Sequence, residues 1–600
     1  MNKSQDTFGF TDVALAVAKL IPKIPHLIRS NAKFSKVSAG DKLSTGAIFE
    51  GVAELHPDRP FLFFEHQKWT YAQFNAWVNQ IAHYFEKQGI QRGDCIALIF
   101  ENRPELLACV FAAHKLGAIA GMLNHQQRGD VLVHSIGLIK PKMLVAGAEC
   151  LEAIAPLQAQ FAHELTFHWY GEGDAPAGFR HVSAEIGAAP RSNPPQTKEI
   201  TLREKCFYIF TSGTTGLPKA ASMTHHRWYK AGLGMGVASM RLTPDDVLYC
   251  PLPLYHNNAL TVALSSVINS GGAFALAPKF SASRFWQDIR QHGATSFIYV
   301  GELCRYLLSA PAQSTDSDNK VRVIVGNGMR PEIWDSFQAR FGIKHICEFY
   351  GASENNTGFV NTFNLKRTAG YCPSSYAIVE VDPESEEPIR HVTGFMQKIG
   401  KGQTGLLITE VTSTIPFDGY SDKKATEAKL FRDVFVKGDA WFNTGDLVRD
   451  QGFRHIAFVD RLGDTFRWKG ENVATTEVEG VLMRHPGITD ATVFGVSIPN
   501  TDGRAGMAAI TLERQGAFDG ADIGRFLHAH LPAYAVPLFI RLTGVQESTA
   551  TFKVKKGDLK RDGYAQTHDD PVYVLTERER GYVPLTATMR TSIQQGQTRL

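Results

Sequence analysis

The sequence lacks a charge bias, clustered cysteines and a long uninterrupted apolar run. Its 63 basic and 60 acidic side chains leave a net charge of +3, and Lys and Arg are scattered among acids instead of forming a basic stripe. We therefore expect no nucleic-acid partner. The 8 cysteines lie far apart, with no CxxC pair and no nearby His set at metal-ligand spacing. This pattern favours a reducing cytoplasmic compartment and no structural zinc.

Several catalytic motifs are also missing. The sequence has no HExxH, no GxSxG and no GxGxxG after a strand. Gly232, Gly234 and Gly236 have the wrong spacing for the last motif and lie in a segment with a helical pattern. These absences disfavour a metalloprotease, a serine hydrolase with a nucleophile elbow and a Rossmann dehydrogenase.

The N-terminal region contains no segment that resembles a secretory signal. Residues 1–10 lack a charged stretch that leads into an apolar core, so the mature protein is expected to begin near Met1. Residues 106–123 are apolar but contain His114 and Lys115, which indicates a buried helix and not a membrane span.

Residues 12–36 mix apolar side chains with basic ones, and Pro22 and Pro25 weaken any long helix there. The segment is compatible with an arm packed on the protein body and with an arm that rests on an anionic membrane surface. Sequence alone leaves both readings open. The basic residues are Lys19, Lys23, Arg29, Lys33 and Lys36.

A chain of 600 residues exceeds what one hydrophobic core usually organises, so we expect at least two domains. Helical and strand patterns alternate from about residue 47 to 350, which predicts parallel sheets with helices. A strand-rich region follows to about residue 460. We thus predict an α/β large N-terminal domain with two parallel-type sheets and a strand-rich subdomain, then a small α+β C-terminal domain. The predicted boundaries are 1–46 for the arm, 47–460 and 461–600.

The loop TSGTTGLPKA, which begins at Thr211 and includes Lys219, follows a predicted strand. Glycines let backbone N–H groups approach phosphate oxygens, hydroxyls donate hydrogen bonds, and the lysine adds positive charge. The glycine-to-lysine spacing and Ala220 differ from a Walker A loop. Such a loop by itself is as compatible with an ordinary surface turn.

Three further motifs support a nucleotide site. Residues 349–354 (FYGASE) offer an aromatic face, a hydroxyl and a carboxylate within one turn. Residues 439–446 end on Asp446, a carboxylate suited to ribose hydroxyls, and residues 460–472 form a charged, glycine-punctuated segment at the expected domain boundary. Each of these motifs alone also has a structural explanation, as a buried tyrosine, a capping aspartate or a solvated linker.

In this order, the motifs resemble the adenylate-forming superfamily of acyl-CoA synthetases, carrier-protein adenylation domains and luciferases. Six segments look closest to its branch of fatty-acid transport proteins and very-long-chain acyl-CoA synthetases. They are residues 252–260, 279–295, 299–308, 326–334, 349–361 and 463–482.

The resemblance implies an ATP-dependent fatty acyl-CoA synthetase that uses ATP, Mg²⁺ and coenzyme A, with an acyl-adenylate intermediate. It assigns phosphates to the loop, adenine to residues 326–328 and Tyr350, ribose to Asp446 and Arg461, and Mg²⁺ to Glu354. Thr214, Lys219, Glu354 and Lys553 would be the catalytic residues. The nucleotide- and cofactor-binding set is Thr211, Ser212, Gly213, Thr214, Thr215, Gly216, Lys219, Gly326, Asn327, Gly328, Tyr350, Gly351, Ser353, Asp446, Arg461, Gly470, Glu471 and Asn472.

The adenylation step joins two oxyanions, so a cation must bridge the carboxylate and the α-phosphate. By the resemblance this cation is Lys553, preceded by Phe552 where the wider family has glycine; Lys555 and Lys556 are the neighbours that compete with it. Gly463 stands at the hinge, where relatives have Asp or Lys, and Gly470, Glu471 and Asn472 would line the pantetheine channel.

His256 would lie at the mouth of the acyl site, although a lone His also fits a protein core. The acyl tunnel is expected near residues 262–274. The expected partners are fatty acid, ATP and CoA, with a homodimer by family analogy and contact with a membrane surface. The location would be cytoplasmic or peripheral on the inner face of a membrane. Two alternatives stay open: a carrier-protein adenylating ligase, and a membrane-associated transport or lipid-binding protein with a vestigial nucleotide site.

Overall fold

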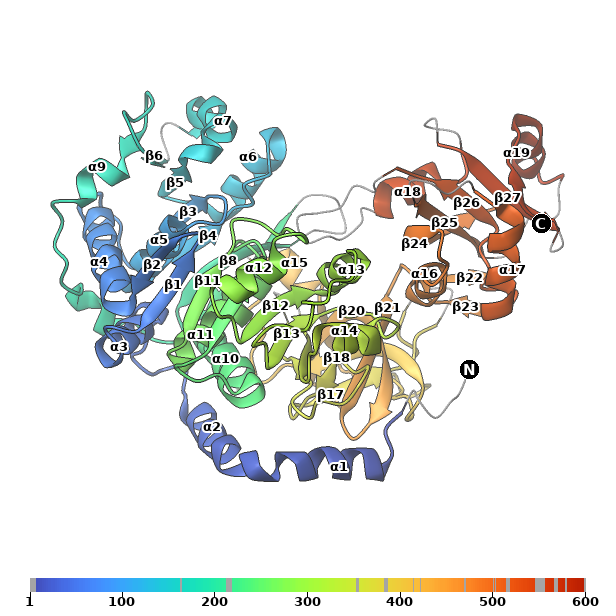
Figure 1. The fold of residues 1–600 in the computed structure, drawn as a ribbon, viewed down its shortest axis with the longest axis horizontal. Coiled ribbons are helices and arrows are strands. Elements are labelled where there is room, and N and C mark those ends of the chain that lie inside the picture. The colour runs from blue at the N-terminus through green and yellow to red at the C-terminus, as the bar shows by residue number, and fades with distance from the viewer. Residues whose placement is uncertain are drawn as a thin grey trace. The chain divides into compact units, whose positions relative to one another are not determined.

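In the computed structural model the chain forms two compact units, and Figure 1 shows its helices and strands coloured along the sequence. The N-terminal unit comprises Gly9–Cys372 and Val411–Leu430, and the C-terminal unit comprises Met1–Phe8, Pro373–Glu410 and Phe431–Leu600. The structure describes residues 7–161, 165–211, 218–351, 355–382, 387–413, 415–420, 422–468, 471–499, 501, 503–513, 518–544, 556–565, 570–577 and 580–597.

The first sheet of the N-terminal unit is parallel except for its last strand. The central strand Cys95–Ile99 is buried along its whole length, as expected for a sheet covered on both faces. Helix α4 (Tyr71–Lys87) begins with a capping box in which Thr70 and Gln73 bond each other's backbone N–H, and α5 (Pro104–Lys115) begins at a proline. The strand order is β7 (Arg180–His181), β6 (Thr166–Tyr170), β5 (Met143–Gly147), β3 (Cys95–Ile99), β4 (Ile119–Met122), β8 (Lys205–Thr211) and β9 (Lys219–Thr224).

The second sheet of this unit has a parallel centre and antiparallel edges. Its parallel strands run from β1 to β14, and β2, β15 and β16 pair antiparallel at the two sides. The order is β2 (Gln67–Thr70), β1 (Pro60–Phe64), β11 (Ala273–Leu276), β10 (Val247–Cys250), β12 (Ser296–Val300), β13 (Val323–Asn327), β14 (Ile346–Tyr350), β15 (Phe359–Val360) and β16 (Gly370–Tyr371).

The C-terminal unit contains an antiparallel layer and a small α+β domain. The layer is formed by β17 (Tyr376–Val379), β18 (Thr404–Glu410), β20 (Ala440–Gly452) and β21 (His455–Arg461). The α+β domain has a sheet of β24 (Ile488–Ser497), β25 (Arg504–Leu512), β26 (Phe539–Leu542), β27 (Val572–Glu577) and β28 (Gly581–Pro584), with helices α16 (Thr475–Leu482), α17 (Gly520–His530), α18 (Lys556–Asp562) and α19 (Ala587–Gln594). The predicted fold class is confirmed. The predicted boundary near Asp460 falls at the end of β21 and stays a prediction.

Residues 106–123 are not one helix, which corrects the prediction for this segment. Helix α5 ends at Lys115, and after a turn at Gly117 (φ 72°) the chain continues as strand β4. Lys115 is fully buried, and its Nζ lies 3.2 Å from a Glu50 carboxylate oxygen. It also donates to the side-chain oxygens of Asn75, Asn79 and Asn193. Within the described ranges, no helix is both long and apolar enough for a membrane crossing.

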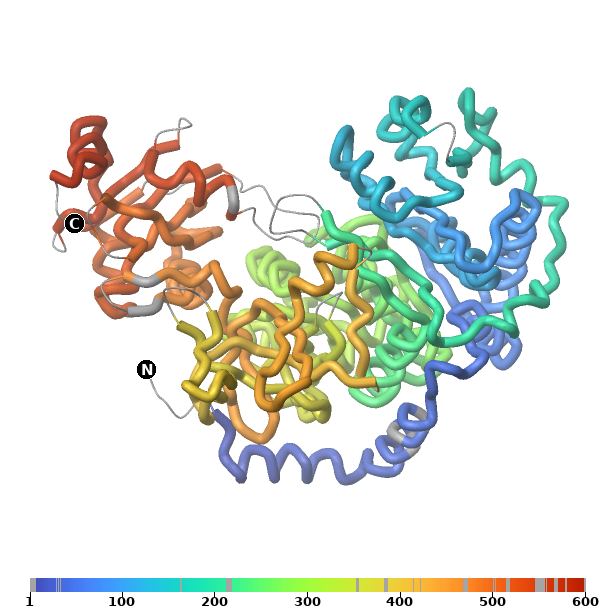
Figure 2. Tube along the Cα trace, turned by 180° about the vertical axis from the view of Figure 1, so that it is seen from behind, coloured from blue at the N-terminus to red at the C-terminus, as the bar shows by residue number. Residues whose placement is uncertain are grey.

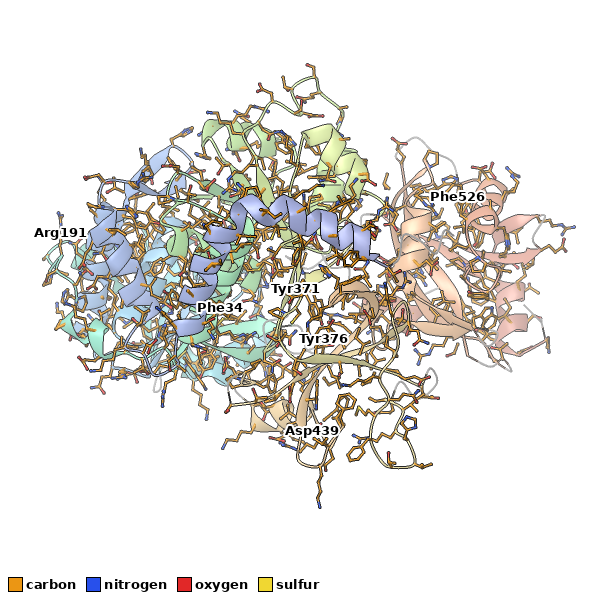
Figure 3. All side chains as sticks on the ribbon, turned by 90° about the horizontal axis from the view of Figure 1, so that it is seen from below. Phe34, Arg191, Tyr371, Tyr376, Asp439 and Phe526 are labelled. Carbon is orange, nitrogen blue, oxygen red and sulfur yellow. The ribbon has the colours of Figure 1, made fainter. Side chains whose placement is uncertain are left out.

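The N-terminal arm is helical, with an interruption at the prolines. It consists of α1 (Phe10–Leu20), the 3₁₀ turn η2 (Ile21–Lys23) and α2 (Ile24–Lys36), which Figure 2 shows as one bent segment. Helix α2 packs on the π-helical segment η6 (Leu233–Met240), where His26 Nε2 lies 2.7 Å from the Val237 carbonyl oxygen. Lys230 Nζ lies 4.8 Å from the centre of the Phe34 ring, which Figure 3 labels near the end of α2. The arm therefore packs on the N-terminal unit.

Candidate active site

The predicted phosphate loop connects two antiparallel strands at the edge of the first sheet. Thr211 ends β8, Lys219 begins β9, and the two residues are direct partners in the strand register. Such pairing holds both ends of the loop side by side. Ser212, Gly213, Thr214, Thr215 and Gly216 lie outside the described residues.

Lys219 is accompanied by a segment that the sequence analysis did not single out. Its Nζ lies 5.7 Å from the centre of the Tyr420 ring. The backbone of strand β9 also binds this segment, because Ser222 N donates a hydrogen bond to the Gly419 carbonyl oxygen at 3.1 Å. The only sequence signal was a glycine before an aromatic residue, which many turns share. Tyr420 thus borders the lysine end of the phosphate loop.

The predicted adenine segment Gly326–Gly328 packs closely at its first residue and at the neighbouring Gly301. A Cβ on Gly326 would lie 2.3 Å from the Tyr299 carbonyl oxygen, and one on Gly301 would lie 1.6 Å from the Gly328 carbonyl oxygen. Gly328 also has a φ of 80°, which favours glycine. Close packing against β12 and Gly301 therefore requires glycine at 326 and 301, which leaves backbone exposed beside Asn327 for contact with a flat ring.

A buried carboxyl group binds the backbone directly after the adenine segment. Glu348, 5% exposed in β14, accepts a hydrogen bond from Met329 N at 3.1 Å and another from the Tyr299 hydroxyl. Burial raises the pKa of Glu348 to about 8, because the charged form loses its hydration. The sequence analysis missed Glu348, since one acid in an apolar strand gives no periodic signal.

The other predicted residues of this edge follow the same strands. Tyr350 ends β14, and its ring centre lies 6.1 Å from that of Phe359; Gly351 comes next. Asn258 Nδ2 donates to Asn327 Oδ1 at 2.7 Å, which joins the loop of His256 to the end of β13. His256, half-buried, lies 4.4 Å from Tyr255 between ring centres. Ser353 and Glu354 lie outside the described residues.

The structure therefore gathers His256, Gly326–Gly328 and Tyr350 at the carboxyl ends of β10, β13 and β14. In open parallel sheets, ligands bind at this edge, because loops and backbone N–H groups converge there. This edge of the sheet presents the backbone of Gly326–Gly328, the aromatic ring of Tyr350 and the polar side chain of His256.

The predicted ribose pair lies in the C-terminal unit. Asp446 in β20 and Arg461 in β21 are direct cross-strand partners, and Arg461 Nε lies 3.7 Å from Asp446 Oδ1. Asp446 is 9% exposed, whereas the Arg461 side chain is about half exposed. A cross-strand carboxylate and guanidinium present an acceptor and donors on the same face of the layer.

The predicted hinge lies directly after this pair. Gly463 has a φ of 89°, and its carbonyl oxygen accepts a hydrogen bond from Lys560 Nζ at 3.0 Å. The same ammonium lies 2.6 Å from Asp464 Oδ1. The turn is thus tied to helix α18 by one lysine.

The remaining predicted residues are only partly described. Glu471 and Asn472 begin β23 (Glu471–Val473), which pairs antiparallel with β22 (Phe466–Trp468), while their side chains are outside the description. Gly470 and Lys553 also lie outside the described residues. Their roles stay predictions.

Two family models match this chain in the expected order. The model of AMP-binding enzymes covers residues 49–399, and that of the AMP-binding enzyme C-terminal domain covers residues 477–553. The chain belongs to the AMP-binding enzyme family. Within this family, the medium/long-chain fatty-acid–CoA ligase FadD6 of Mycobacterium tuberculosis is 46% identical over 590 residues, which is 98% of each chain. Long-chain fatty acid transport protein 6 of Mus musculus is 37% identical over 91% of this chain and 89% of its own.

Solved structures of AMP-binding enzymes share the fold. The anthranilate CoA ligase AuaEII in complex with anthranoyl-AMP matches with a TM-score of 0.76 at 20% identity, over 88% of this chain and 98% of its own. ATP-bound MatB from Rhodopseudomonas palustris matches with a TM-score of 0.73 at 22% identity, over 86% and 98%. The recognition of the adenylate-forming superfamily from sequence motifs is confirmed.

Proposed function

We propose that this protein is an ATP-dependent fatty acyl-CoA synthetase acting on medium- to very-long-chain acids. A fatty carboxylate attacks the α-phosphorus of ATP, forming the acyl-adenylate and releasing diphosphate; the CoA thiol then attacks the acyl carbon and releases AMP. The observation that carries the proposal is the 46% identity, along 98% of both chains, with a ligase named for medium- and long-chain fatty acids. The very-long-chain end of the range rests on the resemblance of the sequence motifs alone.

In the adenylation step, we assign each part of ATP and the fatty acid to separate residues. Lys219, at the end of the phosphate loop, would neutralise the triphosphate, and the Gly326–Gly328 backbone with Tyr350 would hold adenine. Asp446 is assigned to the ribose hydroxyls with Arg461, and His256 to the mouth of the acyl site. Glu354, as a hard oxygen ligand, would hold Mg²⁺, which offsets phosphate charge when bound. Thr214 and the loop from Thr211 would hold phosphate oxygens.

Two assignments complete the cycle. Lys553 would bridge the attacking carboxylate and the α-phosphate, where two negative groups must approach. After adenylation, rotation about Gly463 would withdraw this lysine and bring Gly470, Glu471 and Asn472 toward CoA. A φ near 89° is a conformation that glycine leaves and re-enters at low cost, which supports the choice of pivot.

An exposed apolar stripe on the arm supports a peripheral location on the inner face of a membrane. Phe10, Val17, Ile21, Ile24 and Ile28 repeat at helical spacing and are 77, 44, 58, 42 and 64% exposed. Lys19, Lys23 and Lys36 are exposed on the same arm and suit anionic lipid. Binding to a membrane would place the enzyme beside its substrate and link synthesis to fatty-acid uptake. The homodimer is proposed by family analogy alone.

The test is an acid panel from acetate to very long chains, with Mg²⁺-ATP and purified full-length protein. Diphosphate and acyl-CoA are both measured, with and without CoA. The proposal requires acyl-CoA from long chains and little from acetate. A protein that binds these acids but releases no diphosphate would instead be the transport or lipid-binding alternative, and one that loads only a carrier protein would be the other alternative.

A further inference from the structure

A cavity of about 350 Å³ lies beneath helix α1, on the N-terminal unit. Its opposite wall includes His345, which directly precedes β14, and Arg241, which follows η6. Tyr350 lies at the other end of the five-residue strand β14, about 16 Å away at the usual rise per residue. The cavity is therefore at the amino ends of the strands, opposite the edge assigned to the nucleotide.

The cavity has an excess of positive charge. Arg241 Nη2 donates to His345 Nδ1 at 3.0 Å, so this His nitrogen is an acceptor. Arg241 Nη1 is buried and has no hydrogen-bond partner in the described part of the chain. Lys19 enters from α1, and the one acid of the lining, Asp12, already accepts Gly9 N at 2.8 Å.

Burial and a neighbouring cation both act against the charge of Arg241. Burial lowers the pKa of Arg241 because the guanidinium loses hydration, and the nearby guanidinium of Arg322 lowers it further, while Cys347 acts in the opposite direction. Arg322 itself is paired with Asp246, with Nη2 and Oδ2 2.6 Å apart. A buried donor without a partner costs about 1–3 kcal/mol, so a rotation of the guanidinium that turns Nη1 toward an anion in the cavity is favoured.

The remainder of the lining is mostly apolar, with two polar residues, Thr362 and Asn364. Leu15, Ala16 and Leu20 enter from α1, and Phe363 and Leu365 face them from the segment after β15. A pocket lined by two cations, one carboxylate, and aliphatic and aromatic side chains fits a negatively charged head with a hydrocarbon tail. Its volume is near the lower end of ligand pockets, so it takes a head group and part of one chain.

We propose that this cavity is a second ligand site, which binds a single-chain anionic amphiphile with its head at Arg241 and Lys19 and its chain along Leu15, Leu20 and Phe363. A carboxylate and a phosphate share this chemistry. Phe10 and Val17 of the exposed apolar stripe lie on α1 as well, so the same helix would take part in both the lipid contact and the amphiphile site.

The experiment measures calorimetric binding of four twelve-carbon probes, below their micelle concentrations, to the full-length protein. Dodecanoate and dodecyl phosphate test the two anionic heads, and dodecanol and dodecyltrimethylammonium are the neutral and cationic controls. A saturating non-hydrolysable acyl-adenylate analogue occupies the catalytic site. Dodecanoate binding alone would identify a fatty acid and dodecyl phosphate binding alone a lipid phosphate; either result supports the site.

Matched variants separate this cavity from the arm's surface. Ala16→Phe fills the cavity from its buried side, whereas Ala18→Phe adds the same ring at an exposed position of α1. Lys19→Gln removes a lining charge, and Lys23→Gln removes an exposed charge that is not in the lining. Arg241→Gln is an independent variant, and melting temperatures check that each variant is folded.

The expected result is one equivalent of anion bound, weakened at least tenfold in Ala16→Phe and about tenfold in Lys19→Gln and Arg241→Gln, because a charge-assisted hydrogen bond contributes that much. The Ala18 and Lys23 variants should stay within about twofold, which is the range expected of surface changes. Equal binding by all variants, or equal binding of dodecanol and the cation, would overturn the proposal. The difference in probe affinity between Ala16→Phe and wild type does not depend on whether the adenylate analogue occupies the catalytic site. Failure of this proposal can therefore be distinguished from failure of the synthetase assignment.

Discussion

Lys556 Nζ lies 2.9 Å from Glu479 Oε1, at the start of helix α18. The same ammonium donates to Thr475 Oγ1 at 3.0 Å, and Thr475 donates from its backbone N and its hydroxyl to Asp460. Glu479 also accepts Val493 N at 2.9 Å. Lys556 is therefore committed to a buried network between α16, α18 and β21, which leaves Lys553 and Lys555 as candidates for the bridging cation.

Replacing Lys556 should therefore destabilise the protein. Lys556→Met leaves the Glu479 carboxylate, 8% exposed, without its cation, and we expect a loss of about 2 kcal/mol of unfolding free energy. The control is Arg561→Met on the same helix, where the side chain is 72% exposed and its pair with Asp558 contributes little. Urea midpoints compare the two. Equal midpoints would show that the network does not stabilise the unit.

A methyl group at the hinge should separate the two half-reactions. Gly463→Ala places a Cβ at φ 89°, which costs about 1 kcal/mol or more. We expect ATP–diphosphate exchange within about twofold of wild type and slower acyl transfer to CoA, because transfer requires the rotation. Gly438→Ala is the control, since Gly438 has the same φ of 89° and open space around it. If both half-reactions slow equally, Gly463 is not the pivot.

The sequence motifs predicted the family and the layers, because Gly-rich loops and strand patterns are local signals. They did not reveal Glu348 or Tyr420, whose roles depend on which strands become neighbours. The same limit explains residues 106–123, where continuous apolar character concealed a helix followed by a strand. Strand alternation in the sequence would only place Lys556 on the opposite side from Lys555, whereas the structure begins helix α18 at Lys556 and pairs it with Glu479.

The buried acid predicts a pH dependence of stability. Folding raises the pKa of Glu348 from 4.5 to about 8, so between these values the folded protein keeps a proton that the unfolded chain releases. The contribution of Glu348 is thus fully present below pH 4.5 and is lost as pH rises through about 8. Glu348→Gln has no proton to lose, so its melting temperature should improve relative to wild type from about pH 5 to about pH 8.

The control for this comparison is Glu65→Gln, at an exposed strand-end position of the same unit. It should follow the wild-type profile. A Glu348→Gln difference that is constant with pH would show that this carboxyl is ionised throughout.

Membrane contact by the arm can be measured with one engineered thiol. All 8 native cysteines are buried, and burial raises the pKa of Cys95, Cys150, Cys250 and Cys347 to about 12, so native thiols should not label. Val17→Cys carrying a polarity-sensitive dye should turn bluer with anionic vesicles and much less with zwitterionic ones. Asp174→Cys, exposed in a loop after β6, is the control. No change at Val17 with either vesicle contradicts membrane contact.

The most direct test of the account is fatty-acid-dependent ATP–diphosphate exchange without CoA, in wild type, Lys553→Ala and Lys555→Ala. Exchange requires reversible formation of the acyl-adenylate and nothing else. We predict exchange in wild type and Lys555→Ala, and a loss of at least about a hundredfold in Lys553→Ala, since the bridging charge acts in the transition state. The absence of exchange in folded wild-type protein with every acid tried would contradict the assignment as a synthetase.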